Sequence, residues 1–386
     1  MDDRLYLDHN ATSPLRPQVR DVMLDVLSSG PCNPSSTHSE GRAAKARLSN
    51  ARTTLGEVLS APIEGIVFTG GGTEAVGLAI HSAIRGAAGV KRIFLGATEH
   101  DAVRSTAHAY RDQGAVEIED VPVLPTGQID TDWLARRLDS YEADTDGPFL
   151  LCVMLANNET GVINEIGQLG PLIWPKGGYL FVDAVQGFGK LPIDFTACGA
   201  DFMAICGHKI GGPVGAGALL LKPGLECVAV HRGGGQESYR RAGTEAVAAI
   251  AGLAKAAELA SPLDYRGLAV SRDAIEKRLP KGVTIWGRSA PRLGNTSCFS
   301  APGFWSETQV MVMDLDGIAV SAGSACSSGK VRRSGVLAAM GASDDLAGCA
   351  IRVSFGWSTP EGAADRFVRQ WTQHYERVVG SSTAAA

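Results

Sequence analysis

Short apolar runs alternate with longer amphipathic stretches, and this alternation constrains the fold more than any other feature. The runs are rich in Val, Ile and Phe and lie at 66–69, 92–96, 150–155, 179–182, 202–205 and 217–221. Helices are expected at 75–83, 103–112 and 246–259. Strands that alternate with helices need crossover connections, which build a mostly parallel, buried sheet with helices on its faces. The prediction is an α/β fold.

The pattern changes after Pro262, where longer helical stretches and only a few strands follow. We expect a second, smaller α+β domain in this C-terminal part, against which the first residues of the chain pack. The predicted division places residues 16–260 in a large domain, and residues 1–15 together with 261–386 in a small one.

The composition argues against several classes of protein. Of 386 residues, 45% are apolar and 20% are charged, which is ordinary for a globular chain with a sizeable core. A formal net charge of −5 with no dominant basic stripe argues against a nucleic-acid binder. The longest apolar runs, 149–156 and 246–254, are far shorter than the ~20 residues of a transmembrane helix. The acidic start MDDRLYLDHN lacks the apolar region of a signal peptide.

The cysteines are scattered, and no two of them form a C-x-x-C pair, so neither a zinc ribbon nor a redox motif is expected. No metal site is predicted. This scatter is typical of reduced thiols in the cytoplasm, where we expect the protein, rather than of a disulfide framework. The eight cysteines are Cys32, Cys152, Cys198, Cys206, Cys227, Cys298, Cys326 and Cys349.

Residues 70–74 (GGGTE) follow one expected strand and open an expected helix. Free N–H groups at a helix N-terminus, with the hydroxyl of Thr73, make a binding site for an anion such as phosphate. Gly70, Gly72 and Ala75 also match the loose dinucleotide-binding fingerprint, although that motif usually opens its fold. A tight turn followed by a capped helix is the purely structural alternative.

Asp183 stands at the end of the expected strand 179–182, where open α/β sheets bind ligands. Its carboxylate can hold a ring nitrogen protonated, or it can cap the next helix. Lys209 follows strand 202–205 and precedes a glycine-rich loop. A lysine held among small apolar residues has its pKa lowered, as a Schiff-base lysine requires, although a single lysine is usually solvated. A phosphate site, a carboxylate and a lysine at successive strand ends together predict a pyridoxal-phosphate site.

Three further side chains follow expected strands or lie in one. His100 can stack on a flat cofactor and move protons, or it can cap a helix or fill the core. Asn158, in the run 157–159 (NNE), can bind a ring hydroxyl or a substrate carboxylate, or shape a turn. Arg352, in the strand-like run 351–355, can bind a substrate carboxylate through both guanidinium nitrogens, or pair with an acid.

Cys326 lies in the run 321–329 (SAGSACSSG), whose Ser, Gly and Ala residues predict an exposed, mobile loop. Free cysteines are usually buried, which makes this position unusual. Lys330, Arg332 and Arg333 follow closely, and nearby positive charge favours the reactive thiolate. We hypothesise that these cations also attract an acidic acceptor protein. The alternative is an incidental cysteine beside a solvated basic patch.

Together these residues resemble the cysteine desulfurases, within the class V aminotransferase-like group of fold-type I pyridoxal-phosphate enzymes. The resemblance runs from Tyr6 to about Thr359 and implies a mostly parallel sheet sandwiched by helices, with a smaller α+β C-terminal domain. The loop GSACSS (323–328) resembles the subgroup with a long cysteine loop, which is associated with iron–sulfur assembly. The other matching motifs are CNPSSxH (32–38), FTGGGTE (68–74), NNETG (157–161), VDAVQ (182–186), HK (208–209), GGGQE (233–237) and RAGTE (241–245).

The resemblance implies a role for each residue. Lys209 would bind the cofactor covalently, His100 would stack on its ring and assist proton transfer, and Cys326 would be the nucleophile. Pyridoxal 5′-phosphate would be held by Gly72, Thr73, Asn158, Asp183, Gln186, Cys206, His208, Lys209 and Thr244. The substrate, L-cysteine, would be bound by Arg352, helped by Asn33 or Asn158.

The implied reaction converts L-cysteine to L-alanine. Lys209 would take the proton from Cα, and the Cys326 thiolate would attack the substrate sulfur and become a persulfide. The sulfur would then pass to an iron–sulfur scaffold or another sulfur-relay protein. The family also implies a homodimer, in which Thr244 reaches the neighbouring active site.

The chain departs from the family pattern at three positions. Cys206 stands where a serine usually contributes a hydroxyl to the phosphate, and a thiol is a poorer donor. His9 replaces the common Asn or Tyr, and it could contact substrate or only fill space. Val214 replaces a frequent lysine and so removes a charge near Lys209.

Several rival functions share part of this pattern. A selenocysteine lyase, an aminotransferase or a kynureninase-like hydrolase would use the same Lys209, Asp183 and phosphate loop, but Cys326 favours a desulfurase because transamination needs no thiol nucleophile. Selenocysteine lyase chemistry is nearly identical and is the closest alternative. A dinucleotide-dependent oxidoreductase would leave Lys209 and Asp183 unexplained, and a non-enzymatic scaffold would leave a complete site without use.

Overall fold

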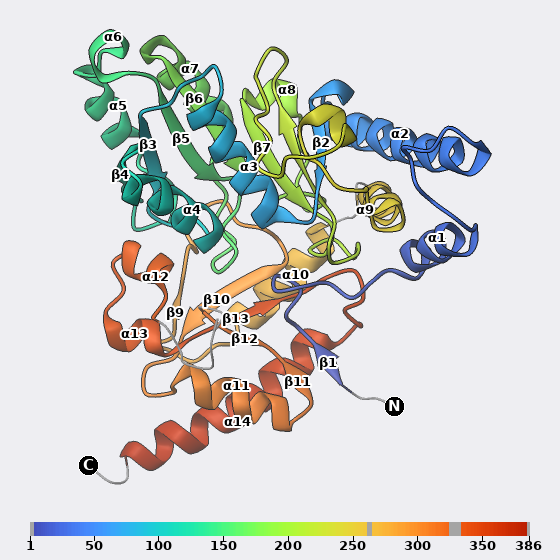
Figure 1. Cartoon of the computed structure of the whole chain (residues 1–386). Coiled ribbons are helices and arrows are strands. Elements are labelled where there is room, and N and C mark those ends of the chain that lie inside the picture. Colours follow the sequence, from blue (N-terminus) through green and yellow to red (C-terminus); the bar gives the residue numbers. More distant parts are fainter. Residues whose placement is uncertain (1–3, 261–264, 324–332, 384–386) are drawn as a thin grey trace.

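The computed structural model describes residues 4–260, 265–323 and 333–383. Cys326, Lys330 and Arg332 lie outside the described residues, so their predicted roles are not tested by it. The chain forms a large sheet with helices on both faces and a smaller group of strands and helices below it (Figure 1).

The large sheet confirms the predicted α/β fold. Its seven strands lie in the order β2 (Ile66–Thr69), β8 (Gly217–Leu221), β7 (Phe202–Cys206), β6 (Gly178–Asp183), β5 (Phe149–Met154), β3 (Arg92–Gly96) and β4 (Glu117–Val121). Only β8 runs antiparallel to its neighbours; the other pairs are parallel. The sheet is therefore mostly parallel, as expected from the continuous apolar runs.

Alternate residues of the central strands point into two separate cores, which shows that the sheet is covered on both sides. In β5, Leu150 and Cys152 pack with α3 (Gly72–Arg85) and α4 (Asp101–Asp112). Leu151 and Val153 pack instead with the helices of the opposite face. These are α1 (Pro17–Ser28), α2 (Ser39–Leu59), α5 (Thr131–Asp139), α7 (Leu169–Ile173) and α9 (Val247–Ala260).

The C-terminal part has the predicted α+β architecture. A four-stranded antiparallel sheet has the order β12 (Ser321–Ala322), β13 (Ala350–Ser354), β10 (Thr296–Ser300) and β9 (Thr284–Ile285). Its core includes Phe299 and Trp371, whose rings meet edge to face with centroids 5.3 Å apart. Helices α10 (Tyr265–Glu276), α11 (Ser306–Leu315) and α14 (Ala363–Thr383) pack around this sheet.

The N-terminal segment joins the C-terminal part. Strand β1 (Leu5–Tyr6) pairs in parallel with β11 (Ile318–Ala319), and Asp8 forms a bridge with Ser354 of β13 (Figure 1). This pairing carries residues 9–11 towards the C-terminal ends of the large sheet's strands. The domain boundaries at 16 and 260 remain a prediction.

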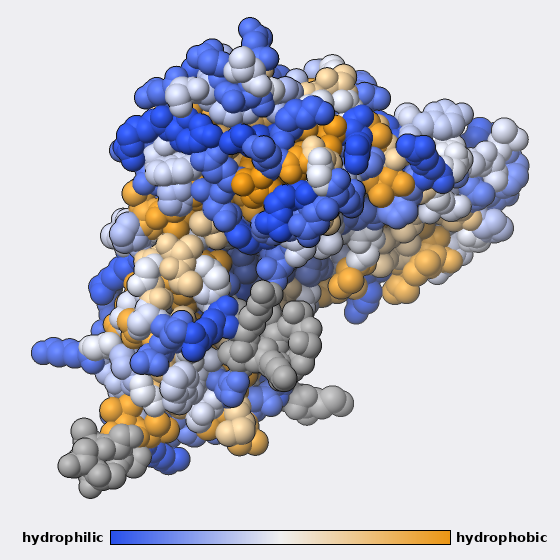
Figure 2. All heavy atoms as spheres, turned by 60° about the vertical axis from the view of Figure 1, so that its left-hand side comes forward, coloured by the Kyte–Doolittle hydropathy of each residue, from blue (hydrophilic) through white to orange (hydrophobic). Residues whose placement is uncertain are grey.

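The remaining elements are short. The helices are α6 (Ala143–Asp146), α8 (Phe195–Cys198), α12 (Gly335–Ala339) and α13 (Asp344–Gly348), and the 3-10 turns are η1 (Ile63–Gly65), η2 (Ile166–Gln168), η3 (Trp174–Lys176) and η4 (Gln236–Tyr239). Hydrophilic side chains dominate the face in Figure 2, and the apolar ones form separate patches. Within the described ranges, no helix combines the length and apolar character that crossing a membrane requires.

Candidate active site

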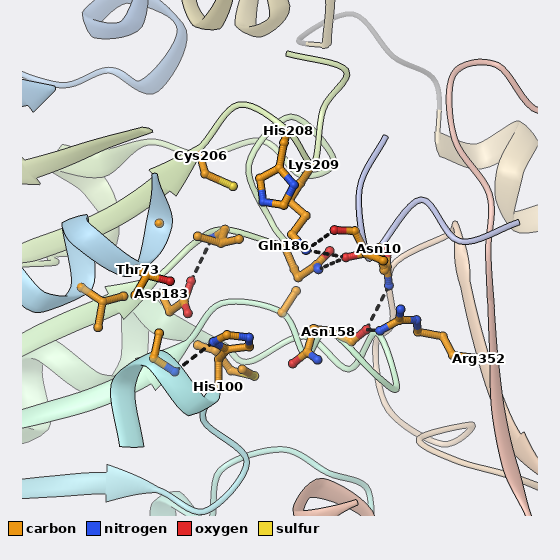
Figure 3. A pocket seen from close by; sticks show the side chains of 17 residues that line it. Asn10, Thr73, His100, Asn158, Asp183, Gln186, Cys206, His208, Lys209 and Arg352 are labelled. Carbon is orange, nitrogen blue, oxygen red and sulfur yellow. Dashed lines mark hydrogen bonds between the residues drawn. The ribbon is translucent and has the colours of Figure 1, made fainter. Parts of the chain in front are cut away.

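A cavity of about 320 Å³ lies beyond the carboxyl ends of β5, β6 and β7, where open parallel sheets bind ligands. Strand β13 of the smaller sheet closes its other side through Arg352. Figure 3 shows the side chains of both parts converging on one space. The predicted site residues that line it are Gly72, Thr73, His100, Asn158, Asp183, Gln186, Cys206, His208, Lys209 and Arg352.

The N-terminus of α3 meets the cavity at Gly72 and Thr73. Gly71 precedes the helix with φ at 149°, a conformation that side chains disfavour. A Cβ atom at Gly72 would lie only 2.8 Å from Cγ2 of Val185. The first N–H groups of a helix have no partner within it. The glycines therefore bring these donors to the cavity wall, as a phosphate site requires.

Asp183 ends β6 and is only 6% exposed. Its Oδ1 accepts a hydrogen bond from Val185 N at 3.0 Å, and a turn rather than a helix follows. The alternative prediction, a helix-capping role, is therefore wrong. Burial raises the pKa of Asp183, and the nearby His100 and Lys209 act in the opposite direction. A cationic ring nitrogen in the cavity would stabilise this buried carboxylate.

Lys209 reaches the same cavity from the loop after β7. Its Nζ donates to the backbone carbonyl oxygens of Asn10 and Ala11, each at 2.7 Å. Burial lowers the pKa of Lys209, and the charge of Arg352 adds to this effect. The amine is thus held in place and shifted towards its neutral, nucleophilic form.

His100 has the predicted helix-capping role, and it also lies at the cavity, where its predicted stacking and proton transfer remain a prediction. It caps α4, because its Nδ1 accepts from Ala102 N at 3.1 Å, and its ring also lines the cavity. With Nδ1 acting as acceptor, the proton of the neutral ring is assigned to Nε2. The cap therefore holds the imidazole in one orientation beside Asp183 (Figure 3).

Arg352 lies in the cavity wall with its side chain only 3% exposed. Its Nη1 donates to the backbone oxygen of Asn158 at 2.9 Å, and its Nη2 pairs with Oδ1 of Asp8 at 2.7 Å. Its Nε is buried without a hydrogen-bond partner among the described atoms. The structural alternative, pairing with an acid, is therefore present in this structure.

Two predicted residues that the structure describes, Asn33 and Thr244, are not at the cavity. Asn33 is exposed, and its Oδ1 accepts from Ser35 N at 3.0 Å in a local turn. Thr244 is also exposed, in the segment between η4 and α9. Neither lines the cavity of this chain. Cys326 lies outside the described residues.

The departures from the family pattern differ in their consequences. Cys206 lines the cavity, and burial raises the pKa of its thiol to about 11, so the sulfur is uncharged. His9 is buried outside the cavity lining, bonded through Nδ1 to Ser13 Oγ at 2.8 Å, and packed against Gly356. The structure therefore favours the second alternative for His9, that it fills space, over contact with substrate. Val214 is 79% exposed and contributes nothing to the cavity wall.

Asn10 is a central site residue that the sequence analysis missed. Its backbone oxygen accepts from both Lys209 Nζ and Gln186 Nε2, at 2.7 and 2.8 Å. Its side-chain oxygen accepts from Lys190 Nζ at 2.9 Å and Asn295 Nδ2 at 3.1 Å. Only the fold shows this role, because Asn10 and Lys209 are 199 residues apart.

Glu99 is a second missed residue, although its neighbour His100 was selected. Its Oε1 accepts from Met154 N at 2.5 Å, and its buried Oε2 has no partner among the described atoms. Burial raises the pKa of Glu99 well above its usual value, and the charge of Asp183 raises it further. Burial and the charge of Asp183 therefore both favour the protonated form of this carboxyl group.

Comparisons with known proteins agree with this geometry. The sequence model of the family described as Aminotransferase class-V matches residues 5–367. A cysteine desulfurase of Cereibacter sphaeroides is 37% identical, with 95% of this chain and 94% of that protein covered. An IscS-like cysteine desulfurase of Mycobacterium tuberculosis is 35% identical, with 93% of each covered. The X-ray structure of a NifS-like protein from Rickettsia africae superposes with a TM-score of 0.87 at 30% identity, covering 97% and 99% of the two chains.

Proposed function

Because this chain belongs to the aminotransferase class-V family and is a pyridoxal-phosphate-dependent cysteine desulfurase, we propose how its own residues carry that activity. One observation carries the proposal: Lys209, Asp183 and the N-terminus of α3 line the same cavity. The residues present fit the cofactor. A side chain at Gly72 would clash with Val185, and burial raises the pKa of the Asp183 carboxyl, which a cationic ring nitrogen in the cavity would offset.

Different residues of the cavity are proposed to bind different parts of the cofactor. Gly72, Thr73 and His208 would bind the phosphate, Asp183 the ring nitrogen, and Lys209 the aldehyde carbon. Gln186 and Asn158 would contact the ring hydroxyl or the substrate, and the Cys206 thiol would stand beside the phosphate as a weak donor. Bound there, pyridoxal phosphate supplies an electron sink for a carbon that loses its proton.

Lys209 is the proposed base that takes the Cα proton of L-cysteine. Burial and Arg352 lower the pKa of Lys209, which favours the neutral amine that can accept a proton. The carbonyl oxygens of Asn10 and Ala11 accept from its N–H groups and hold the nitrogen at the cavity. His100 is proposed to stack on the ring and to assist proton transfer.

Arg352 is the proposed anchor for the carboxylate of L-cysteine. Its guanidinium binds the carboxylate of Asp8 and keeps Nε without a hydrogen-bond partner among the described atoms, which supports carboxylate binding at this wall. Asn158 lines the same wall and contacts Arg352 through its backbone oxygen, whereas Asn33 lies elsewhere. The geometry therefore favours Asn158 over Asn33 as the helper.

Cys326 is the proposed sulfur acceptor, which becomes a persulfide and passes its sulfur to an iron–sulfur scaffold or a sulfur-relay protein. The described ends of its segment both lie near the cavity wall. Gly323 N donates to Ala350 O at 3.1 Å in β13, the strand that carries Arg352. Ser334, at the other end, donates to Glu159 at 2.6 Å, next to Asn158. Several relatives are named IscS, which supports the iron–sulfur destination.

The assembly and the compartment are also proposals. A homodimer would bring the exposed Thr244 to the cavity of the partner, and α1 exposes Leu24 and Leu27, which such an interface could bury. The scattered cysteines support the cytoplasm as the location, because no disulfide joins those that the structure describes.

The experiment is an absorbance spectrum of the purified protein, followed by addition of L-cysteine with alanine and sulfide quantified. We expect a visible cofactor band and equal yields of alanine and reducible sulfur. Lys209→Ala should remove the band, and Cys326→Ala should keep the band but abolish sulfur release. A band without alanine or sulfur would contradict the proposed roles. Absence of a band after addition of pyridoxal phosphate would contradict the cofactor site.

A further inference from the structure

A second lysine lies behind the site, buried and without an ionic partner. Lys190 is 6% exposed, in the turn between β6 and α8. Its Nζ donates to Gln186 Oε1 at 2.6 Å and to Asn10 Oδ1 at 2.9 Å. Over the described ranges, no carboxylate lies within ion-pair distance of it. A buried lysine in such surroundings calls for an explanation, because lysine is rarely buried without a partner.

The hydrogen bonds of Lys190 match an uncharged amine. A neutral amine has two N–H groups, and two acceptor oxygens face Nζ. The groups that act on it are mostly cationic or uncharged: Lys209, Arg352 and the thiol of Cys206. The neighbouring His9 and His208 add no positive charge near neutral pH, because burial lowers the pKa of each to about 4. Burial lowers the pKa of Lys190 well below its usual value, and both Lys209 and Arg352 lower it further.

These contacts determine how the neighbouring amide lies. Nζ of Lys190 donates to the Gln186 amide, so the oxygen of that amide faces the lysine. The amide nitrogen is thereby turned to the backbone oxygen of Asn10, at 2.8 Å. That same oxygen accepts from Lys209 Nζ. Lys190 thus bonds directly to Gln186, a proposed cofactor ligand. It is linked to Lys209, the proposed base, through Asn10.

We propose that Lys190 is a positioning residue, which acts as an uncharged donor of two hydrogen bonds and sets the orientation of the Gln186 amide and of Asn10 around Lys209. The inference rests on the proposed function, because the cofactor contacts of Gln186 and Lys209 belong to it. Without Lys190, the Gln186 amide loses the contact that selects its orientation, and the Asn10 side chain loses a donor.

The test compares Lys190→Met, which keeps an unbranched apolar chain one atom shorter and removes both donors, with Lys190→Gln, which keeps two N–H groups on one uncharged nitrogen. Lys222→Met is the matched control, because Lys222 is half exposed and pairs with Asp201 away from the cavity. Two cofactor readouts are measured: the dissociation constant of pyridoxal phosphate, and the pH midpoint of the visible band. We expect Lys190→Met to weaken binding by about tenfold and to shift the midpoint, and Lys190→Gln to stay within about threefold of the unaltered protein.

A third readout uses the protein without cofactor. A lysine that is uncharged in the fold but charged when unfolded makes stability rise with pH. Between pH 7 and 9.5 we expect the melting temperature of the unaltered protein to rise relative to that of Lys190→Met, by about 1–3 °C per pH unit. The same comparison with Lys222→Met should show no such rise.

Each outcome decides the inference. Cofactor binding and band midpoint unchanged in Lys190→Met would overturn it, as would a loss in Lys190→Gln as large as in Lys190→Met. If the difference in melting temperature between the unaltered protein and Lys190→Met does not change with pH, Lys190 is not uncharged in the folded protein. A missing band in the unaltered protein would instead contradict the proposed function, while the measurement without cofactor would still decide the charge of Lys190.

Discussion

At the scale of one residue, Cys206 places a weak hydrogen-bond donor beside the proposed phosphate site. Its thiol is buried and uncharged, and burial raises its pKa to about 11. Cys206→Ser keeps the size and adds a hydroxyl, whose hydrogen bond contributes about 0.5–1.5 kcal/mol. We expect the dissociation constant of pyridoxal phosphate to fall about two- to tenfold, measured by absorbance titration. Cys198→Ser, in α8 away from the cavity, is the control. Unchanged or weaker binding in Cys206→Ser would contradict the expectation.

Glu159 makes stability depend on pH. Its Oε2 accepts from Ser334 Oγ at 2.6 Å, and burial raises its pKa to about 7. The folded state therefore keeps a proton that the unfolded state releases near pH 4.5, so this contribution to stability is full below that pH and is lost as the pH rises through 7. Glu159→Gln keeps an acceptor and removes the titration. Relative to the unaltered protein, we expect its free energy of unfolding to rise by up to about 3 kcal/mol between pH 4.5 and 8.

Urea unfolding at several pH values measures this difference. Glu361→Gln, which makes the same change at an exposed position, serves as the control. A flat difference for Glu159→Gln would show that the Glu159 carboxyl is ionised throughout, contrary to the expectation.

At the scale of one element, two glycines of helix α3 have different effects: Gly72 allows close packing, and Gly77 only lowers the helix propensity. A Cβ at Gly72 would lie 2.8 Å from Val185 Cγ2 and 3.7 Å from Cys206 Cβ, whereas a Cβ at Gly77 would meet nothing within 4 Å. Gly72→Ala should push the helix start from the strand ends, lower stability by about 1–3 kcal/mol and weaken cofactor binding at least tenfold. Gly77→Ala should instead raise stability by about 0.5–1 kcal/mol, because alanine favours a helix interior. Denaturation and cofactor titration of both variants test this, and equal behaviour of the two would refute it.

The strands were predictable to the extent that they were buried. Continuous apolar runs located β2, β3 and β8 at their observed bounds and β5, β6 and β7 within a residue. Strand β4 was missed, because Glu117–Val121 lies at the sheet edge and carries three acidic residues. An edge strand pairs along one side only and tolerates charged residues, so its composition does not distinguish it from a loop.

At the scale of the whole molecule, the site is built from segments that only the fold brings together. Motifs at strand ends were predictable, because parallel strands end at one edge of the sheet. Asn10 and Lys190 were not, because their roles depend on contacts between segments 180 residues apart. The pairing of β1 with β11 carries Asn10 into the site, and no local pattern around residue 10 encodes that.

The predicted homodimer concerns the whole molecule as well, because it would give Thr244 a role that a single chain does not. Thr244 is exposed and does not line the cavity, as a role at the neighbouring site of a homodimer would require. Mixing two variants tests this directly, because a hybrid dimer of Lys209→Ala and Thr244→Ala chains contains one site with both residues intact. Refolding equal amounts together should restore about a quarter of the unaltered activity, since about half of randomly formed dimers are hybrids and each has one intact site. If Thr244 acts within its own chain, the mixture gains nothing over the average of the two variants. Size-exclusion chromatography with light scattering confirms that the mixed sample is dimeric, so that a missing gain contradicts the shared site itself.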